Sequence, residues 1–217
     1  VPGDLGHFRR TSANSDITPS LSLRTPAVTD GQAATIQTRH LLREAAPMIR
    51  PDYRGGGLVN LMASVIQARG GRAEYQQLGL LPAPELGDAR HVALLVIDGL
   101  GDDWLCRHSA DGLLVRHRLG AMHTVFPATT ASAITSYLTG DAPQQHGLTG
   151  WFMWLRELGC VMTVLPGTPR FGGVGYGKAG IDLDRLFGHR STFARVGGRS
   201  AVISPRQIAR SDYNLAH

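Results

Sequence analysis

Residues 92–99 read VALLVIDG, and this stretch decides the predicted fold. Residues 92–97 are all apolar, and no polar side chains alternate with them. This pattern is typical of a central strand in a parallel sheet, which is covered on both faces. Such a strand would end at Asp98 and Gly99, at the edge where open α/β sheets place their ligands. Asp98 is therefore either a ligand-binding carboxylate or the N-cap of the following helix.

The remaining sequence predicts further helices and strands in alternation. Apolar spacing and helix-breaking residues predict helices over 33–46, from 58 to near 70, and over 131–139, 182–187 and 192–196. Short apolar runs predict strands over 123–126, 160–165 and 200–203. Such alternation predicts an α/β fold with a mostly parallel central sheet and helices on both faces. Residues 1–30, rich in Ser, Thr and Pro, are predicted to be irregular, and residues 78–90 to be a connector.

The composition is that of one globular domain. The chain has 217 residues, of which 42% are hydrophobic and 18% charged, which is enough for a single core. The net charge is +5, but the basic residues are scattered arginines without interleaved aromatic residues, and Lys178 is the only lysine. This arrangement argues against a nucleic-acid platform.

The sequence carries no signal for a membrane or for secretion. No apolar run reaches the ~18 residues of a membrane span, and the first residues contain no apolar h-region. Cys106 and Cys160 have neither metal-ligand nor C-x-x-C spacing. We therefore expect a cytoplasmic protein with reduced thiols and no membrane partner.

The predicted turn after the first strand carries three carboxylates. Residues 99–101 (GLG) resemble the start of a dinucleotide fingerprint, but Trp104 stands at the position of the third glycine. Asp98, Asp102 and Asp103 would repel a bare phosphate unless a cation lay between them. The turn therefore favours a metal ion over a dinucleotide. Asp102 and Asp103 also suit the first turn of a helix, where the helix dipole stabilises them.

A pair of threonines follows the strand predicted over 123–126. Residues 126–130 read FPATT and lead directly into the helix predicted over 131–139. Thr130 would thus lie at the N-terminal end of a helix that follows a sheet strand. A threonine hydroxyl must lose its proton to act as a nucleophile, and helix N–H groups and a divalent cation favour the alkoxide. The alternative is that Thr129 or Thr130 is a plain N-cap.

Four short motifs follow one another in a fixed order. They are DG at 98–99, FPATT at 126–130, TG at 139–140 and PQQHG at 143–147. In this order and spacing they resemble the type I phosphodiesterase and nucleotide pyrophosphatase family of the alkaline phosphatase superfamily. The resemblance implies an alkaline-phosphatase-like sandwich, of which residues 31–217 are the N-terminal portion.

The resemblance also implies an activity. It implies an enzyme that hydrolyses small-molecule phosphoesters with two divalent metal ions, expected to be Zn²⁺. Asp98 would bind one metal ion. Thr130 would be the nucleophile, contact the same metal ion and form a covalent phosphoryl intermediate. Thr129 aligns with a position that the family fills with non-nucleophilic residues, and His146 with a structural histidine.

Two features depart from the family pattern. The family places a phosphate-binding Asn shortly after the H-G turn, where this chain has Trp151, which argues against nucleotide specificity. We interpret Trp151, Phe152 and Trp154 as packed core rather than as an apolar substrate wall. The family's downstream Asp and His ligands do not occur before His217, and the spacing of Asp212 and His217 is one residue too long.

The downstream metal ligands decide between an enzyme and a non-catalytic protein. Without them, the C-terminal part of the fold is missing, and the chain is expected to be a fragment that is inactive by itself. No oligomeric state is predicted. One alternative is a non-catalytic remnant that acts as a fold or partner-binding module. Another is a phosphonate or sulfate ester hydrolase on the same fold.

Overall fold

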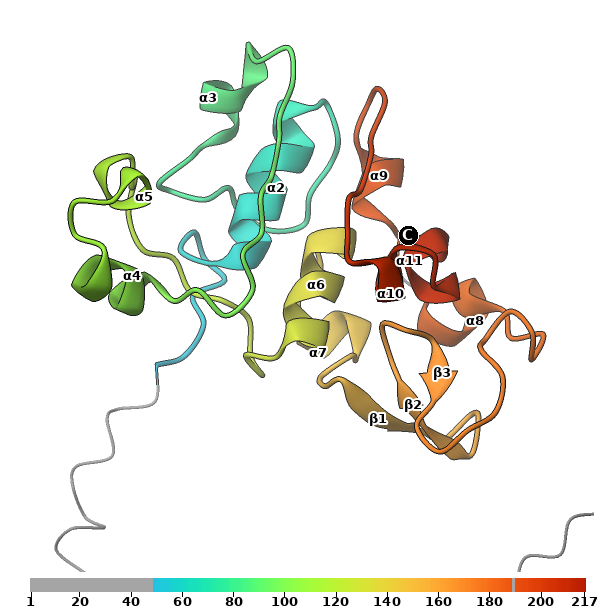
Figure 1. Cartoon of the computed structure of the whole chain (residues 1–217). Coiled ribbons are helices and arrows are strands. Elements are labelled where there is room, and N and C mark those ends of the chain that lie inside the picture. Colours follow the sequence, from blue (N-terminus) through green and yellow to red (C-terminus); the bar gives the residue numbers. More distant parts are fainter. Residues whose placement is uncertain (1–48, 189) are drawn as a thin grey trace, which may run out of the picture. The chain divides into compact units, whose positions relative to one another are not determined.

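The computed structural model describes residues 49–188 and 190–217 (Figure 1). The irregular segment predicted over 1–30 and the helix predicted over 33–46 lie outside the described residues. The described part contains many short helices and one three-stranded antiparallel sheet. The mostly parallel sheet that the sequence predicts is not formed by these residues.

The longest helix in the described residues is α2 (Leu58–Ala68), which confirms the second predicted helix. Its first turn is closed by Asn60, whose Oδ1 accepts a hydrogen bond from the Gly57 amide at 3.0 Å. The side-chain amide of Asn60 donates to the carbonyls of Tyr53 and Gln76 at 3.0 and 2.8 Å. This buried side chain therefore joins three segments of backbone.

A short helix lies in the segment that the sequence predicts to be a connector. Helix α3 (Ala83–Gly87) follows Pro82 and packs against α2. The connector prediction for 78–90 is wrong here, because the first turn of a helix tolerates proline, whose missing N–H leaves no hydrogen bond unmade. The side chain of Gln77 accepts a hydrogen bond from the Ala83 amide at 2.8 Å and fixes the start of the helix.

Residues 92–97 form no strand in the structure. Their backbone makes no ladder hydrogen bond with any described residue, and Leu95 is 80% exposed. Residues 200–203 also form no strand, and Ile203 is fully exposed. An apolar run becomes a strand only where neighbouring strands supply hydrogen bonds and a covered face. The described residues supply neither, so both strand predictions are wrong for this structure.

A single parallel bridge replaces the strand predicted over 123–126. The His123 amide donates to the Gly56 carbonyl at 2.8 Å, and the Leu58 amide donates to the His123 carbonyl at 2.9 Å. These two bonds form an isolated bridge between Gly57 and His123. The bridge holds the segment that leads into the next long helix against the start of α2.

Two short helices follow residues 92–97 along the chain. They are α4 (Asp102–His108) and α5 (Leu113–Arg116), and none of their residues is buried. Asp102 and Asp103 lie in the first turn of α4, as predicted. Arg118 donates to Asp102 at 2.8 Å, and this hydrogen bond is the main reason that the pKa of the Asp102 carboxyl lies below its usual value.

Helix α6 (Thr130–Thr139) confirms the helix predicted over 131–139. It ends at Gly140, whose φ of +75° is a left-handed conformation that glycine adopts without strain. A Cβ at this glycine would lie 3.0 Å from Ile66 of α2. Helix α7 (Pro143–His146) follows after a short turn. In Figure 1, α6 lies between α2 and the sheet.

The sheet consists of β1 (Phe152–Leu155), β2 (Cys160–Thr163) and β3 (Thr168–Pro169), in that order. Both pairings are antiparallel, with Phe152 opposite Thr163 and Met162 opposite Pro169. The strand predicted over 160–165 is therefore confirmed over 160–163, but in an antiparallel hairpin. Consecutive strands joined by short turns pair in this way, since a parallel pair needs a long crossover connection.

The C-terminal part consists of four short helices. They are α8 (Leu183–Phe187), α9 (Thr192–Arg195), α10 (Arg206–Ala209) and α11 (Asp212–Ala216). The first two confirm the helices predicted over 182–187 and 192–196. Asp182 and Ser191 cap them through side-chain hydrogen bonds at 3.1 Å to Arg185 and Phe193 amides.

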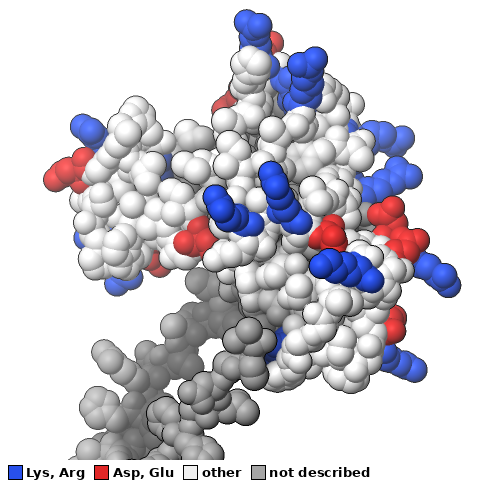
Figure 2. Space-filling view, turned by 45° about the vertical axis from the view of Figure 1, so that its right-hand side comes forward, with Lys and Arg blue, Asp and Glu red and all other residues white. Residues whose placement is uncertain are grey.

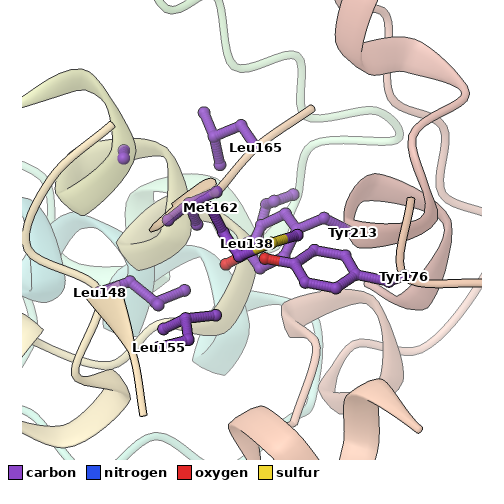
Figure 3. Close-up of a cluster of buried hydrophobic side chains, with 9 residues drawn as sticks. Leu138, Leu148, Leu155, Met162, Leu165, Tyr176 and Tyr213 are labelled. Atoms are coloured by element: carbon purple, nitrogen blue, oxygen red, sulfur yellow. The ribbon is translucent and has the colours of Figure 1, made fainter. Parts of the chain in front are cut away.

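Two clusters of buried side chains pack on α6. The larger cluster joins α6 to the sheet and to α11, and Figure 3 shows Leu138, Met162, Tyr176 and Tyr213 in close proximity. The Tyr213 hydroxyl is within 2.8 Å of the Thr135 hydroxyl of α6. The smaller cluster joins α6 to α2 through apolar residues that include Leu58, Val59, Met62, Val125 and Ala142. Packing on both sides therefore fixes the position of α6.

Charged side chains are spread over the surface. On the face in Figure 2, Lys and Arg side chains occupy several separate places, with Asp and Glu side chains among them. Among the helices that the structure describes, none is long and apolar enough to cross a membrane.

Candidate active site

The N-terminal end of α6 gives the two adjacent threonines different positions. Thr129 is the N-cap, and its hydroxyl oxygen accepts a hydrogen bond from the Ser132 amide at 3.3 Å. The same hydroxyl donates to the Thr149 carbonyl at 3.2 Å. Thr130 is the first residue of the helix and has no capping role. The N-cap interpretation therefore holds for Thr129 and not for Thr130.

The Thr130 hydroxyl lies beside the Asp98 carboxylate. Thr130 Oγ1 donates a hydrogen bond to Asp98 Oδ2 at 2.8 Å, across 32 residues of sequence. Asp98 lies in a turn with Gly99, whose φ of +77° is left-handed. The N-cap of α4 is Gly101, so Asp98 does not cap that helix. Its carboxylate is therefore available to the hydroxyl.

The pair lies beside the start of α6. The Thr130 amide, at the first position of α6, donates no backbone hydrogen bond outside the helix among the described residues, and Ala131 is buried. Unpaired amides at the start of a helix carry a partial positive charge and bind anions. The described ion pairs, Arg118–Asp102 and Arg195–Asp141, do not involve Asp98. The Thr130 hydroxyl and the Asp98 carboxylate thus meet beside the start of α6.

Tyr137 belongs to the same neighbourhood. Burial raises the pKa of its hydroxyl, and the negative charge of Asp98 raises it further. The sequence interpretation missed this residue. Tyr137 lies seven positions after Thr130 on α6, and this spacing places two side chains on one face of a helix. The spacing is the signal that could have identified it.

The described residues do not form a complete site for a catalytic zinc ion. Asp98 and Thr130 supply two oxygen atoms 2.8 Å apart. A catalytic zinc ion typically has about three protein ligands. No group of three or more His, Cys, Asp or Glu side chains within residues 49–188 and 190–217 is arranged to hold a metal ion.

Asp212 and His217 make structural contacts. Asp212 Oδ2 accepts a hydrogen bond from the Gly177 amide at 2.7 Å. His217 Nδ1 lies 2.7 Å from the Tyr213 carbonyl, and burial lowers the pKa of the imidazole. The first contact holds α11 against the loop at 177, and the second joins the C-terminal residue to the backbone of α11. They account for both residues without a metal ion.

His146 joins α6 to the turn after α7. Its Nδ1 accepts a hydrogen bond from the Leu148 amide at 3.1 Å, and its Nε2 lies 3.2 Å from the Ser136 hydroxyl. Because Nδ1 is the acceptor, a neutral ring would carry its proton on Nε2. The side chain is buried, in agreement with the structural role expected from the resemblance.

The aromatic residues after the turn lie at the surface. Trp151, Phe152 and Trp154 are all exposed, so their interpretation as packed core is wrong. The sequence could not show this, because residues 152–155 are all apolar. No alternation of polar and apolar residues therefore distinguishes the exposed face of the strand from the buried face. Thr149, two residues before Trp151, contacts the N-cap Thr129. These aromatic residues therefore follow directly after the segment that contacts the start of α6.

The comparisons with known proteins agree with the order of these motifs. Residues 92–172 match the model of the family described as type I phosphodiesterase / nucleotide pyrophosphatase. The matched range contains Asp98, Thr130 and His146. Neither the curated proteins nor the solved structures give a significant match to the chain. Residues 92–172 of this chain are therefore similar to the type I phosphodiesterase / nucleotide pyrophosphatase family.

Proposed function

We propose that this chain contains the nucleophile of a phosphoester hydrolase, with Thr130 as the nucleophile and Asp98 as the group that orients and activates it. The observation that carries the proposal is the 2.8 Å hydrogen bond from Thr130 Oγ1 to Asp98 Oδ2. A nucleophilic hydroxyl needs an adjacent acceptor for its proton, and a carboxylate at hydrogen-bond distance meets this requirement. The family match indicates a hydrolase of the phosphodiesterase and pyrophosphatase type.

The proposed reaction has two steps. In the first, Thr130 Oγ1 forms a bond to phosphorus, its proton moves to Asp98, and the ester oxygen leaves with its electron pair. The Thr130 amide at the start of α6 would contribute to stabilising the charge on the phosphoryl oxygens. In the second, water attacks phosphorus and its lost proton balances the ester anion that has left, while Thr130 Oγ1 leaves phosphorus and takes back the proton held by Asp98.

The family also implies two divalent metal ions, for which we retain zinc as the expected metal. Asp98 and Thr130 would each give one oxygen ligand to a shared ion. A divalent ion bound there would lower the pKa of the Thr130 hydroxyl and neutralise phosphoryl charge. The described residues leave this site incomplete, as the absence of a third ligand among them shows.

The test is turnover of an aryl phosphodiester, bis(p-nitrophenyl) phosphate, with and without added Zn²⁺, by the chain extended at its C-terminus with the Asp and His ligands that the family pattern places downstream. Thr130→Ala should remove turnover, because the hydroxyl is lost, and Thr130→Ser should retain part of it, because a hydroxyl remains. Thr139→Ser, at the other end of α6, is the matched control and should leave turnover unchanged. Undiminished hydrolysis by Thr130→Ala would refute the assignment.

A non-catalytic, partner-binding module is the second candidate. It is favoured by the incomplete set of metal ligands among the described residues and by the exposed apolar run at 94–97. The same assay separates the two candidates, because a non-catalytic module gives no turnover with any metal ion. Parallel assays with p-nitrophenyl sulfate and with a p-nitrophenyl phosphonate would distinguish the related ester hydrolases.

A further inference from the structure

The outward side of the sheet carries exposed aromatic side chains. In β1, Met153 and Leu155 point toward the large buried cluster, while Phe152 is 48% and Trp154 62% exposed. Successive residues of a strand point to opposite faces, so Phe152 and Trp154 share the outward face. The apolar residues of β1 therefore serve two surfaces, of which only one is covered by described residues.

Arg170 lies against the same face. Its amide donates to the Val161 carbonyl at 2.8 Å and extends the ladder between β2 and β3. The guanidinium carbon lies 4.4 Å from the ring centre of Phe152 and 5.1 Å from that of Phe171. Phe171 is itself 83% exposed. Phe152, Trp154, Arg170 and Phe171 are called the aromatic face below.

The Arg170 guanidinium has no carboxylate partner in the described part of the chain. Both ion pairs found there involve other arginines, Arg118 and Arg195. Contact with aromatic rings occupies the faces of the guanidinium plane and leaves its N–H edges for an anion. The nearby hairpin turn carries Arg156 and Glu157, whose opposite charges cancel. Arg170 therefore gives the aromatic face its positive charge.

This combination matches the surface of a lipid bilayer. Trp and Phe with an adjacent Arg are the side chains that bind at the boundary between lipid headgroups and acyl chains. The net charge of +5 adds long-range attraction to an anionic surface. A protein partner would also use Trp and Arg, but a guanidinium that has no carboxylate partner among the residues described and lies against two exposed rings favours a surface rich in phosphate over apolar chains.

We propose that the aromatic face docks on an anionic lipid surface. Trp154, Phe152 and Phe171 would enter the boundary between headgroups and acyl chains, and Arg170 would bind lipid phosphate. The proposal does not depend on the nucleophilic role of Thr130. It also revises the sequence prediction of no membrane partner, because only the structure reveals that these aromatic side chains are exposed.

The test measures binding of the full chain to vesicles by co-sedimentation. Wild-type protein should bind vesicles of phosphatidylcholine with phosphatidylserine and bind pure phosphatidylcholine vesicles much more weakly. The double variant F152A/W154A should lose at least about tenfold in binding, because the buried apolar area on the bilayer is lost. Trp104→Ala is the matched control, since Trp104 is 52% exposed on α4, away from the sheet, and should bind as wild type.

Charge is tested separately. Arg170→Gln should weaken binding to the anionic vesicles about fivefold, while Arg116→Gln on α5 should have a smaller effect. Inorganic phosphate at the same phosphate concentration should not displace the vesicles. Unchanged binding by F152A/W154A, or no binding by wild type, would overturn the proposal. Size-exclusion chromatography gives a third arm, because a dimer that these substitutions dissociate would identify a protein interface instead.

Discussion

At the scale of single residues, the hydroxyls of two adjacent threonines make different contacts. Thr129 caps α6 and contacts the Thr149 carbonyl, while Thr130 contacts Asp98. Removing the cap in Thr129→Ala should lower the free energy of unfolding by about 1 kcal/mol. Thr130→Ala should change it by less than about 0.5 kcal/mol, because its hydrogen bond is exposed.

Urea unfolding of the two variants measures this difference. Thr129→Ser keeps a capping oxygen and should restore most of the lost stability. Equal destabilisation by Thr129→Ala and Thr130→Ala would contradict the division of roles.

The carboxylate that accepts from Thr130 gives a second prediction at this scale. Asp98→Asn keeps the shape of the side chain but removes the negative charge that would take the Thr130 proton. On the proposed function, kcat for bis(p-nitrophenyl) phosphate should fall by about 10²–10⁴-fold. Asp103→Asn, in the first turn of α4, is the control and should leave kcat unchanged. A kcat for Asp98→Asn equal to that of wild type would exclude Asp98 from the reaction.

At the scale of elements, a mostly buried ion pair joins α9 to the turn after α6. Arg195 Nη2 donates to Asp141 Oδ1 at 3.1 Å, and both side chains are largely covered. Burial raises the pKa of the Asp141 carboxyl, although the charge of Arg195 opposes this shift. Arg195→Ala would leave a covered carboxylate without its partner. The free energy of unfolding at pH 7 should therefore fall by about 2 kcal/mol.

The pH dependence of this variant follows from the sign of the shift. A carboxyl whose pKa is higher in the folded protein than in the unfolded chain costs stability once it ionises. Without Arg195 the folded pKa of Asp141 rises further. The stability lost in Arg195→Ala should therefore shrink as the pH falls toward the unfolded value near 4. Denaturant unfolding across pH 4–7 measures this effect, and a loss that is independent of pH would contradict it.

The apolar segment at 92–97, which pairs with no strand among the described residues, gives a further prediction at the scale of elements. Residues 92–97 make no ladder hydrogen bonds with described residues, whereas α6 packs on both sides. Amide hydrogen exchange should therefore be fast over 92–97, close to the rate of an unfolded peptide, and slow within α6. Strong protection over 92–97 would mean that this segment pairs with a strand, as its sequence predicts.

At the scale of the whole molecule, the sequence predicts those helices and turns that depend on residues close together in the chain. The bounds of α2, α6 and α8 follow from local signals, such as Gly140 after α6 and Asp182 before α8. The strands at 92–97 and 200–203 depend on partners elsewhere, so an apolar run alone could not establish them. The proximity of Asp98 and Thr130 was expected from the order of the motifs, even though the strand before Asp98 is not formed.

The last prediction concerns the response of the whole chain to zinc. Two oxygen atoms meet where Asp98 and Thr130 converge, and the described residues add no third ligand. The stability that a ligand adds to the folded state grows with the logarithm of the ratio of its free concentration to its Kd. A weak site therefore raises the Tm only slightly. The Tm should therefore differ by less than about 2 °C between EDTA and a slight excess of Zn²⁺. A rise of about 5 °C or more by calorimetry, lost in Asp98→Asn, would instead require a complete metal site that includes this carboxylate.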